Sequence, residues 1–474
     1  MTRLPKKETV AIIGGGLAGL SAGCALAEAG FKVTLFERRP YLGGRASSYE
    51  HPGTGEVVDN CQHVLLGCCT NLIDLYRRFG AEDKIRWFDR LTFIEPGGRQ
   101  SEIGPSFLPA PFHTAPSFMK ASSLSFADKL AISRAMLVLA SAIKQDTSEN
   151  FLAWLHRHGQ TPGAIARFWK VVLVSALNED LDRMSVYYAA QVFRESFLKS
   201  AAAGRMGVPT VPLTELYSAG AEYIRARGGE VQLRRSVESF RLDSEGVKLS
   251  VIGQGLDFSA DFAILAVPYY VLPKMLPTET CSETLSGQVN SFESSPITGI
   301  HLWFDREITN LEHAVLLDRT IQWMFHKSRL LDRHQNNGSG GSASRGSYVE
   351  LVVSSSKSLV EKSRGEIIEM AMKELLEFFP RAAEAKLLKS TVIKEVHATY
   401  SALPLSDRYR PQPVTAWPRI FLAGDWTSTG WPATMEGAVR SGYKAAEALT
   451  AFEGEKSKFL IADLPASGLM RIFG

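Results

Sequence analysis

Two short apolar runs flank an Ala- and Leu-rich stretch near the start of the chain. Residues 10–13 are apolar and long enough for a buried strand, and residues 31–36 alternate as a second strand does. Residues 17–29 contain no proline and lead into Gly30, which predicts a helix that stops at this glycine. The predicted order is therefore strand, helix, strand.

A glycine pattern fills the turn between the first strand and the helix. Gly14 permits a sharp turn, Gly16 admits a pyrophosphate close to the backbone, and Gly19 lets the helix pack closely on the sheet. Free N–H groups at the helix start, together with the helix dipole, attract phosphates. Glu37, at the end of the second strand, can accept hydrogen bonds from both ribose hydroxyls. The pattern predicts a Rossmann-type dinucleotide site, and the alternative is an ordinary glycine-rich turn.

A second glycine turn follows this unit. Gly43 and Gly44 permit another close approach to the backbone, and Arg45 can pair with phosphate oxygens. A site for NAD alone needs no such element, whereas a longer dinucleotide such as FAD, lying across the domain, does. The alternative is a surface turn with a solvated arginine.

A similar arrangement of strand, turn and helix returns near the C-terminus. Residues 419–425 form an apolar strand that ends in Gly424 and Asp425, and Asp425 can bind a ribityl hydroxyl there. The helix predicted from Met435 to about residue 452 directs its first N–H groups at an anion. A reduced flavin, negative near N1 and O2, suits this position. The alternative is a strand–turn–helix without a function.

Three polar residues lie in an apolar stretch at residues 57–67. Asp59, Gln62 and His63 have hydrophobic neighbours on both sides, which predicts a strand or a buried turn. Buried polar groups are paired, so these side chains need partners in the protein, a cofactor or a substrate. The alternative for His63 is a hydrogen-bonded histidine of the core.

The composition changes at residues 105–204, which are rich in aromatic and aliphatic side chains. Helices are predicted over residues 130–143, 151–158 and 163–177, the first with a wide apolar stripe. Two interpretations compete for this excess of apolar surface. It is either a second hydrophobic core, which composition alone favours, or an oily substrate tunnel with a membrane-facing mouth.

Regular α/β patterning returns after residue 213. A helix is expected over residues 214–227, followed by strands over residues 230–233, 237–242, 247–252 and 262–267. A second sheet and a charged amphipathic helix are expected from residues 299–304, 314–317, 348–354 and 361–378. The Gly- and Ser-rich segment within residues 333–347 predicts a flexible loop.

Composition and charge narrow the class of protein. The chain has 474 residues, of which 45% are hydrophobic, enough for two or three domains. A net charge of +3 gives no argument for a nucleic-acid partner. The five cysteines suggest neither a disulfide framework nor a paired zinc motif, so we expect a reducing cytoplasm and no metal. No apolar run is long enough to span a membrane, and the glycines after Lys6 and Lys7 argue against a secretory signal.

Together these motifs resemble the superfamily of FAD-dependent amine oxidases and phytoene desaturases. The strongest matches are residues 14–19, 43–46, 422–426 and 435–438, and the resemblance spans nearly the whole chain. It implies an α/β fold with a Rossmann-type FAD-binding domain and an inserted α+β substrate domain. The expected FAD-binding segments are residues 1–95, 205–290 and 390–455, and the expected substrate-binding segments are residues 96–204 and 291–389.

The resemblance also implies a set of FAD-binding residues, carried over by position. They are Gly14, Gly15, Gly16, Ala18, Gly19, Glu37, Arg38, Gly44, Arg45, Val237, Gly424, Asp425, Met435 and Ala438. No His or Cys lies in an obvious attachment motif, so we expect non-covalent FAD.

Within the superfamily, residues 59–71 look most like the squalene-associated branch, the hydroxysqualene dehydroxylase family. This implies that FADH2 reduces hydroxysqualene to squalene with loss of water, in squalene and hopanoid biosynthesis. Asp59 and His63, in the turn expected over the flavin, are candidates for the proton donor and the group that orients it, in either order. His397 is a further candidate.

A long isoprenoid alcohol resides in the bilayer. We therefore expect a cytoplasmic enzyme bound peripherally to the inner face of the membrane through part of residues 105–143. Three alternatives share the fold. They are a polyprenoid desaturase with reversed electron flow, an amine oxidase, whose lysine near the flavin we do not find in the sequence, and a non-enzymatic prenyl-lipid-binding protein, against which the retained phosphate-binding glycines argue.

Overall fold

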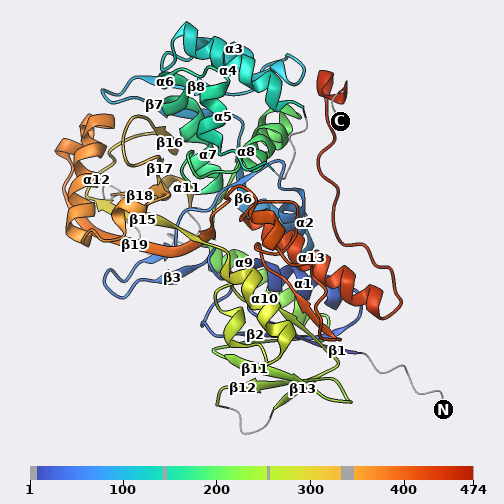
Figure 1. Ribbon diagram of the computed structural model, residues 1–474. Helices are drawn as coiled ribbons and strands as arrows, with labels where there is room; N and C mark the ends of the chain where they lie inside the picture. The colour runs from blue at the N-terminus through green and yellow to red at the C-terminus, as the bar shows by residue number, and fades with distance from the viewer. Residues whose placement is uncertain (1–7, 142–146, 254–256, 332–345, 473–474) are drawn as a thin grey trace.

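The computed structural model describes residues 8–141, 147–253, 257–331 and 346–472 (Figure 1). Residues 333–345 of the predicted flexible loop, and the end of the helix predicted over residues 130–143, lie outside the described residues. Ser347, the last residue of that predicted loop, begins a strand.

A five-stranded parallel sheet forms the centre of the nucleotide-binding part. Its order is β10-β2-β1-β14-β20. The strands are β1 (Thr9–Ile13), β2 (Lys32–Glu37), β10 (Glu230–Leu233), β14 (Phe262–Leu265) and β20 (Ile420–Leu422). Both faces of a parallel sheet are covered, which explains why the central strands β1 and β14 are almost entirely apolar, whereas the edge strand β10 carries polar residues. Along β1, Val10 and Ile12 enter one core, and Ala11 and Ile13 enter the core on the other face.

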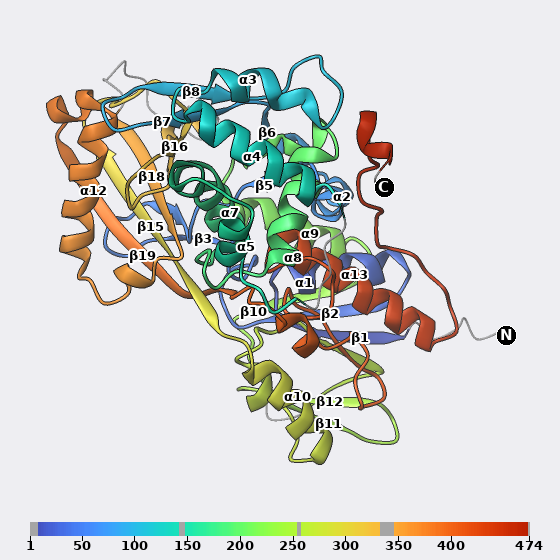
Figure 2. The ribbon, with the colours of Figure 1, turned by 45° about the horizontal axis from the view of Figure 1, so that its top comes forward.

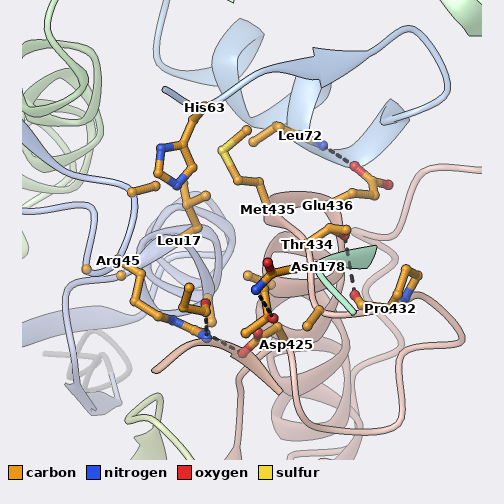
Figure 3. A pocket seen from close by; sticks show the side chains of 18 of the residues that line it. Leu17, Arg45, His63, Leu72, Asn178, Asp425, Pro432, Thr434, Met435 and Glu436 are labelled. Carbon is orange, nitrogen blue, oxygen red and sulfur yellow. Dashed lines mark hydrogen bonds and ion pairs between the residues drawn. The ribbon is translucent and has the colours of Figure 1, made fainter. Parts of the chain in front are cut away.

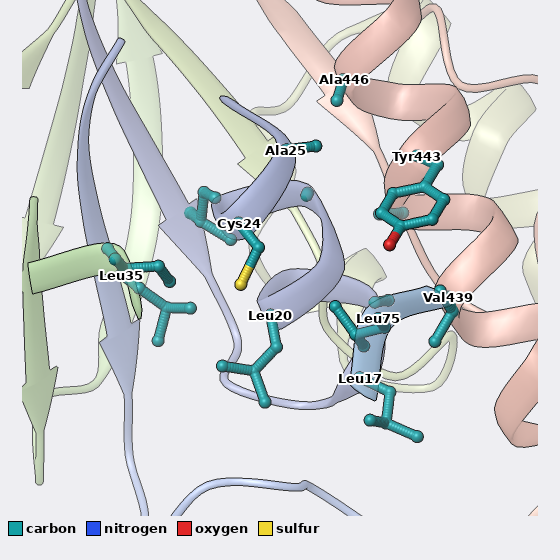
Figure 4. Packing of buried hydrophobic residues seen from close by; sticks show 14 of the residues in the cluster. Leu17, Leu20, Cys24, Ala25, Leu35, Leu75, Val439, Tyr443 and Ala446 are labelled. Atoms are coloured by element: carbon teal, nitrogen blue, oxygen red, sulfur yellow. The ribbon is translucent and has the colours of Figure 1, made fainter. Parts of the chain in front are cut away.

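Helices cover one face of this sheet. They are α1 (Leu17–Glu28), α2 (Thr70–Arg78), α9 (Leu213–Arg225) and α13 (Met435–Phe452). Leu20 and Cys24 of α1 lie in one cluster with Val439 and Tyr443 of α13 (Figure 4). The opposite face is covered by the antiparallel strands β11 (Val237–Leu242), β12 (Val247–Val251) and β13 (Phe258–Ala260) and by α10 (Thr280–Asn290).

A seven-stranded sheet of order β19-β15-β18-β17-β16-β7-β8 forms the second part. Its strands are β7 (Leu91–Ile94), β8 (Gln100–Ile103), β15 (Ser294–Phe304), β16 (His313–Leu316), β17 (Trp323–Phe325), β18 (Ser347–Ser354) and β19 (Leu387–Tyr400). Helix α12 (Arg364–Phe378) shares its core. The pattern did not predict β7, β8, β17 or β19. Residues 390–400, assigned by the expected boundary to the FAD-binding segment, pair with β15 instead.

The helical segment has its own core. Its helices are α3 (Ala115–Lys120), α4 (Phe126–Leu139), α5 (Phe151–Arg157), α7 (Lys170–Leu177) and α8 (Val186–Val192), joined in part by wide π-type turns at Ile165–Trp169 and Phe193–Leu198. Trp154, Trp169 and Phe193 are buried together there. The helices gather at the top of the molecule, near the C-terminus (Figures 1 and 2). In the described part of the chain, none of the helices is both long and apolar enough to span a bilayer.

Small sheets frame the polar turn at residues 60–64. Strand β4 (Val57–Asp59) pairs with β3 (Ser48–Glu50) and ends at Asp59. Strand β5 (Leu65–Leu66) pairs with β9 (Met206–Pro209), which also pairs with β6 (Ile85–Phe88). The turn is therefore held at both ends.

The close crossing of α1 and α13 gives a test of the fold. A Cβ on Gly442 would lie 2.1 Å from Ser21 Oγ and 2.2 Å from the Ala18 carbonyl oxygen. Gly442→Ala must push the helices apart, so we expect the free energy of unfolding to fall by about 1–3 kcal/mol in urea denaturation. The control is Gly287→Ala in α10, where a Cβ meets nothing within 4 Å. Equal stabilities of the two variants would contradict the tight crossing.

Candidate active site

A cavity of about 540 Å³ connects the parallel sheet with the helical segment. Its lining includes Gly14 and Glu37 at the ends of β1 and β2, and Val171 and Ser175 on α7. Figure 3 shows Arg45, His63, Asn178 and Asp425 around this space. A group bound along the sheet edge would therefore face the same space as a substrate held by the helices.

The first turn of α1 is open to an anion. Gly16 precedes the helix, no side chain caps it, and the first turn holds no acidic residue. Gly16, Leu17 and Ala18 line the cavity. Their N–H groups lack partners within the helix, so a phosphate here would satisfy them and meet the positive end of the helix dipole.

The two glycine turns touch each other. Gly43 donates its N–H to the Gly15 carbonyl at 2.9 Å, and Gly16 and Gly43 form an isolated bridge. A Cβ on Gly14 would lie 2.5 Å from the Ala266 carbonyl oxygen. The result is a narrow cradle made of backbone, in which a side chain at Gly14 would collide with the neighbouring strand end.

Glu37 fixes this cradle and faces the cavity. Its buried carboxylate accepts the Gly15 N–H at 2.7 Å and the Arg39 N–H at 2.8 Å. Each carboxylate oxygen can accept a further hydrogen bond, so the ribose role expected for Glu37 is compatible with these contacts.

Residues far apart in the sequence meet at the other side of the cradle. Arg45 donates to Asp425 Oδ1 at 2.6 Å across a separation of 380 residues, and to the Ala398 carbonyl at 2.9 Å. Thr434 caps α13 by accepting the Gly437 N–H at 3.1 Å. The second glycine-rich helix start therefore opens on the same cavity as the first.

Most of the predicted FAD-binding residues line this cavity. They are Gly14, Gly16, Ala18, Glu37, Arg38, Gly44, Arg45, Val237, Gly424, Asp425, Met435 and Ala438. Gly15 and Gly19 do not line it and lie behind the surface. Gly15 holds Glu37, and a Cβ on Gly19 would lie 1.9 Å from the Gly14 carbonyl oxygen. The uncapped helix start, the backbone cradle and the cation at Arg45 fit a dinucleotide diphosphate.

A family model described as flavin containing amine oxidoreductase matches residues 17–450. The chain belongs to this family. It is an FAD-dependent oxidoreductase of α/β fold, as predicted, and FAD supplies two-electron redox chemistry when bound.

Curated relatives of this oxidoreductase are carotenoid desaturases. The 15-cis-phytoene desaturase of Synechococcus elongatus is 28% identical over 94% of this chain and 96% of its own length. The enzyme of an Oncidium hybrid is 28% identical over 94% of this chain and 78% of its own length. The zeta-carotene desaturase of Synechocystis is 26% identical over 96% of this chain and 99% of its own length.

Solved structures share the fold. An oxidoreductase from Methanosarcina mazei has a TM-score of 0.67 and 17% identity over 92% of this chain and 98% of its own. Cyclohexylamine oxidase from Brevibacterium oxydans has a TM-score of 0.64 and 18% identity over 95% and 100%. At these identities the likeness concerns the fold alone.

Among the predicted catalytic residues, His63 lines the cavity of the oxidoreductase. Its Nδ1 lies 2.6 Å from the Cys61 carbonyl oxygen, which can only accept a hydrogen bond, so we assign the proton to Nδ1. Burial lowers the pKa of His63 below its ordinary value. The ring is therefore neutral near pH 7, and Nε2 is left as a hydrogen-bond acceptor.

Asp59, predicted to work with His63 on the substrate, does not line the cavity. Lys327 donates to Asp59 Oδ2 at 2.6 Å and to Gln62 Oε1 at 2.7 Å, and Ser48 donates to Asp59 Oδ1 at 2.5 Å. Burial raises the pKa of Asp59, but the charge of Lys327 and these hydrogen bonds outweigh burial and lower it. The carboxylate is ionised and holds the turn, so it has no proton to donate.

His397 also lies apart from the cavity. It is exposed on β19, its Nδ1 lies 2.7 Å from Ser294 Oγ, and its ring centroid is 4.6 Å from that of Tyr270. The stretch that carries it does lead back to the cradle, because Ala398 and Thr399 line the cavity and the Ala398 carbonyl accepts from Arg45, but the exposed His397 side chain is not part of the lining.

Three residues of the site were missed in the sequence. Lys327 and Glu350 are buried beside Asp59, and Asn178 lines the cavity wall at the end of α7. Asn178 adopts φ 53° and donates to the Ser295 carbonyl at 3.0 Å, which ties α7 to the second sheet. Lys327 follows an apolar strand closely, but nothing in the sequence around it indicates that it pairs with Asp59.

The described residues contain no group of three or more His, Cys, Asp or Glu side chains able to hold a metal ion.

Gly16→Ala separates cofactor binding from folding. Gly16 has φ −75° and ψ 179°, which any residue adopts, and a Cβ there would meet only Gly44 Cα, at 3.8 Å. The methyl group fills space that a diphosphate would use. We expect unchanged stability of the FAD-free protein and at least about ten-fold weaker FAD binding in a fluorescence titration. Gly287→Ala serves as the control, and FAD binding by Gly16→Ala equal to that of the control would contradict the cradle.

Glu350 predicts a pH dependence of stability. The Lys327 ammonium is shared between the carboxyl groups of Asp59 and Glu350. Its Nζ lies 2.6 Å from Asp59 but 3.7 Å from Glu350. Burial raises the pKa of Glu350 from 4.5 to about 8. Between these values the folded state binds more protons than the unfolded chain, so the free energy of unfolding falls as pH rises.

Glu350→Gln keeps the neutral shape and removes this dependence. We expect the slope of unfolding free energy against pH to become less negative, by up to roughly 1 kcal/mol per pH unit, in urea denaturation between about pH 5 and 8. The exposed Glu361→Gln is the control. A slope identical to that of the wild type would show that Glu350 is ionised in the folded protein.

Proposed function

We propose that this oxidoreductase is a desaturase of a long isoprenoid hydrocarbon. A C–H bond of the substrate gives up a hydride, and the neighbouring carbon gives up a proton to Nε2 of His63, so that a C=C bond forms. Bound FAD would supply the two-electron oxidant, and a separate two-electron acceptor would reoxidise it between turnovers. The substrate loses two electrons and two hydrogens, one as hydride and one as a proton.

The contact that carries this proposal is the one between His63 Nδ1 and the Cys61 carbonyl, at 2.6 Å. It leaves an unprotonated Nε2 on a residue that lines the cavity. A general base needs this state, whereas an acid that protonates a leaving hydroxyl needs the opposite one. The phytoene and zeta-carotene desaturases among the relatives support the same direction of electron flow.

The cavity wall suits a hydrocarbon substrate. Apolar side chains contributed by several elements line it, namely Leu91, Phe93, Val171, Val172, Val192, Phe197, Met206 and Trp323. Such a wall excludes water from the reacting carbons and binds an isoprenoid chain through apolar contact.

Hydroxysqualene dehydroxylation is the second candidate. The resemblance of residues 59–71 to the squalene-associated branch favours it. FADH2 would deliver a hydride to the carbon that loses its hydroxyl as water, and the protein would supply a proton. His63 could supply this proton only after protonation of Nε2, and the relatives support desaturation better than this reaction.

An amine oxidase and a protein that only binds prenyl lipids have less support. No lysine occurs among the described residues that line the cavity, so the lysine of an amine oxidase site has no counterpart here. Lys327 is engaged with Asp59 instead. The intact FAD cradle argues against a protein that only binds lipids.

We also propose that part of residues 105–143 contacts the cytoplasmic face of a membrane. Phe107, Phe126 and Leu137 are 95%, 71% and 69% exposed. Exposed apolar side chains at this density fit the interfacial region of a bilayer, from which a long isoprenoid is drawn.

A single-turnover experiment tests the direction of the reaction. Oxidised holoenzyme is mixed without oxygen with detergent-dispersed 15-cis-phytoene, and flavin absorbance and product mass are followed. We expect bleaching and a product lighter by two hydrogens. In a parallel arm, reduced holoenzyme is mixed with hydroxysqualene. Flavin reoxidation with release of squalene, and no reaction with phytoene, would replace the desaturase with the dehydroxylase.

His63→Gln tests the base. We expect normal FAD content and a rate of flavin reduction lower by about 10²-fold or more, because Gln cannot accept the proton. His156→Gln, on the exposed side of α5, is the control and should react like the wild type. A wild-type rate in His63→Gln would remove His63 from the chemistry.

A further inference from the structure

The chain after α13 is fastened along the molecule by hydrogen bonds. Phe459 and Leu460 donate their N–H groups to Glu447 Oε1 at 2.7 and 2.8 Å. Ile461 donates to Asn71 Oδ1 at 2.8 Å, and Arg440 pairs with Asp463. The tail thus has a defined path from the nucleotide-binding part toward the helical segment, as Figures 1 and 2 show.

The tail contains a short 3-10 helix, η11 (Gly468–Ile472), which docks on Ala110 and on the C-terminal end of α4. Leu469 donates its N–H to the Ala110 carbonyl at 2.9 Å, and Ser467 donates to the Lys199 carbonyl at 3.0 Å. Met470 is buried in a cluster with Ala110, Ala140 and Leu198. Docking therefore uses Met470, the Ser467 hydroxyl and the backbone, and it does not use the Leu469 or Ile472 side chains.

The same docking leaves other apolar side chains in solvent. Ile472 is 76% exposed, and Leu469 is also exposed. Ala110, to which the tail is bonded, lies between the exposed Phe107 and Phe112. Ala140, which contacts Met470, ends the helix that carries Leu137. The tail thus extends the exposed apolar residues of the helical segment.

On α4 three exposed apolar residues share one side, while the fourth, Val138, lies next to that side. Phe126, Leu130 and Leu137 follow one another at helical spacing and point away from the core that Ile132 and Leu139 join. We define the apolar surface as Phe107, Phe112, Phe126, Leu130, Leu137, Leu469 and Ile472.

Basic side chains outnumber acidic ones along the segments that carry the apolar surface, although Glu102 of β8, just before them, is exposed. From residue 103 to residue 139 the only acidic residue is Asp128, which is buried and caps α4 through Ser125. Lys120 and Arg134 are exposed. In the tail after Asp463 the only charged side chain is Arg471, also exposed. An apolar surface edged by cations complements the acyl chains and anionic headgroups of a lipid bilayer.

We propose that η11 is the second half of a bilayer-binding surface and that this surface prefers anionic lipid. The proposal rests on the proposed membrane contact of residues 105–143 and adds the tail to it. Leu469 and Ile472 would enter the acyl boundary at the C-terminal end of α4, next to the Ala140 that packs with Met470. Lys120, Arg134 and Arg471 would meet the headgroups.

Flotation of the full-length holoenzyme with vesicles tests the proposal. The probes are phosphatidylcholine vesicles and vesicles with 30% phosphatidylglycerol. We expect stronger binding to the anionic vesicles and at least about ten-fold weaker binding by the double variant Leu469→Ser and Ile472→Ser, which keeps the docking residue Met470. The matched control is Ile252→Ser with Val414→Ser, two exposed apolar residues elsewhere on the chain. The control variant should bind like the wild type.

Two further outcomes distinguish this inference from the proposed membrane contact of residues 105–143, on which it rests. Phe126→Ser with Leu137→Ser removes the contact of the helical segment. If that variant binds weakly and the tail variant binds like the wild type, the membrane contact stands and the role of η11 is wrong. If neither variant loses binding, both proposals fail. Dimers of the wild type that the tail variant no longer forms, in light scattering without lipid, would identify the surface as a protein interface and overturn the inference.

Discussion

The site depends on the glycine turn after β1, where backbone without side chains lies at the carboxyl ends of the parallel strands. The order β10-β2-β1-β14-β20 brings the ends of β1 and β20 to one edge, although they lie far apart in the sequence. Gly16 and Gly43 then meet as backbone against backbone, and Arg45 reaches Asp425 across 380 residues. Because two helix starts open on one cavity, their N–H groups and dipoles act on the same ligand. The close crossing of α1 and α13 keeps the two helix starts together at this cavity.

A second constraint acts on the turn that presents His63. The turn follows β4, and Lys327, two residues after the end of β17, holds both Asp59 and Gln62. Breaking a buried ion pair leaves an uncompensated charge, so this cluster defines the geometry of residues 59–63 more strictly than surface contacts would. The orientation of the His63 ring, and with it the assignment of base rather than acid, is thus connected to the second sheet through one lysine.

Local chemistry explains what could be predicted from the sequence. Short local motifs, recognised by residue type and spacing, identify Gly14, Gly16, Glu37 and the start of α13. The partners of Asp59 do not, because Lys327 is 268 residues away and its pairing depends on how β17 and β18 are placed. The same holds for His397. Strand β19 returns to the cradle, as the sequence suggests, but its pairing with β15 is irregular between Glu395 and Thr399, and the His397 side chain in that stretch is exposed. Long-range strand pairing, rather than local pattern, decides these cases.

The two interpretations of the helical segment, a second hydrophobic core and an apolar tunnel with a membrane-facing mouth, are compatible. Ile132, Ala135 and Leu139 of α4 enter a core with Trp154 and Trp169, as a plain second core requires. That core accounts for one side of α4 only, since Phe126, Leu130 and Leu137 remain in solvent. A surface helix that is apolar on both sides fits the proposed contact of this segment with a bilayer. The π-type turn at Phe193–Leu198 links the docked tail to the active site, because Phe197 lines the cavity while its neighbour Leu198 packs on the docked tail.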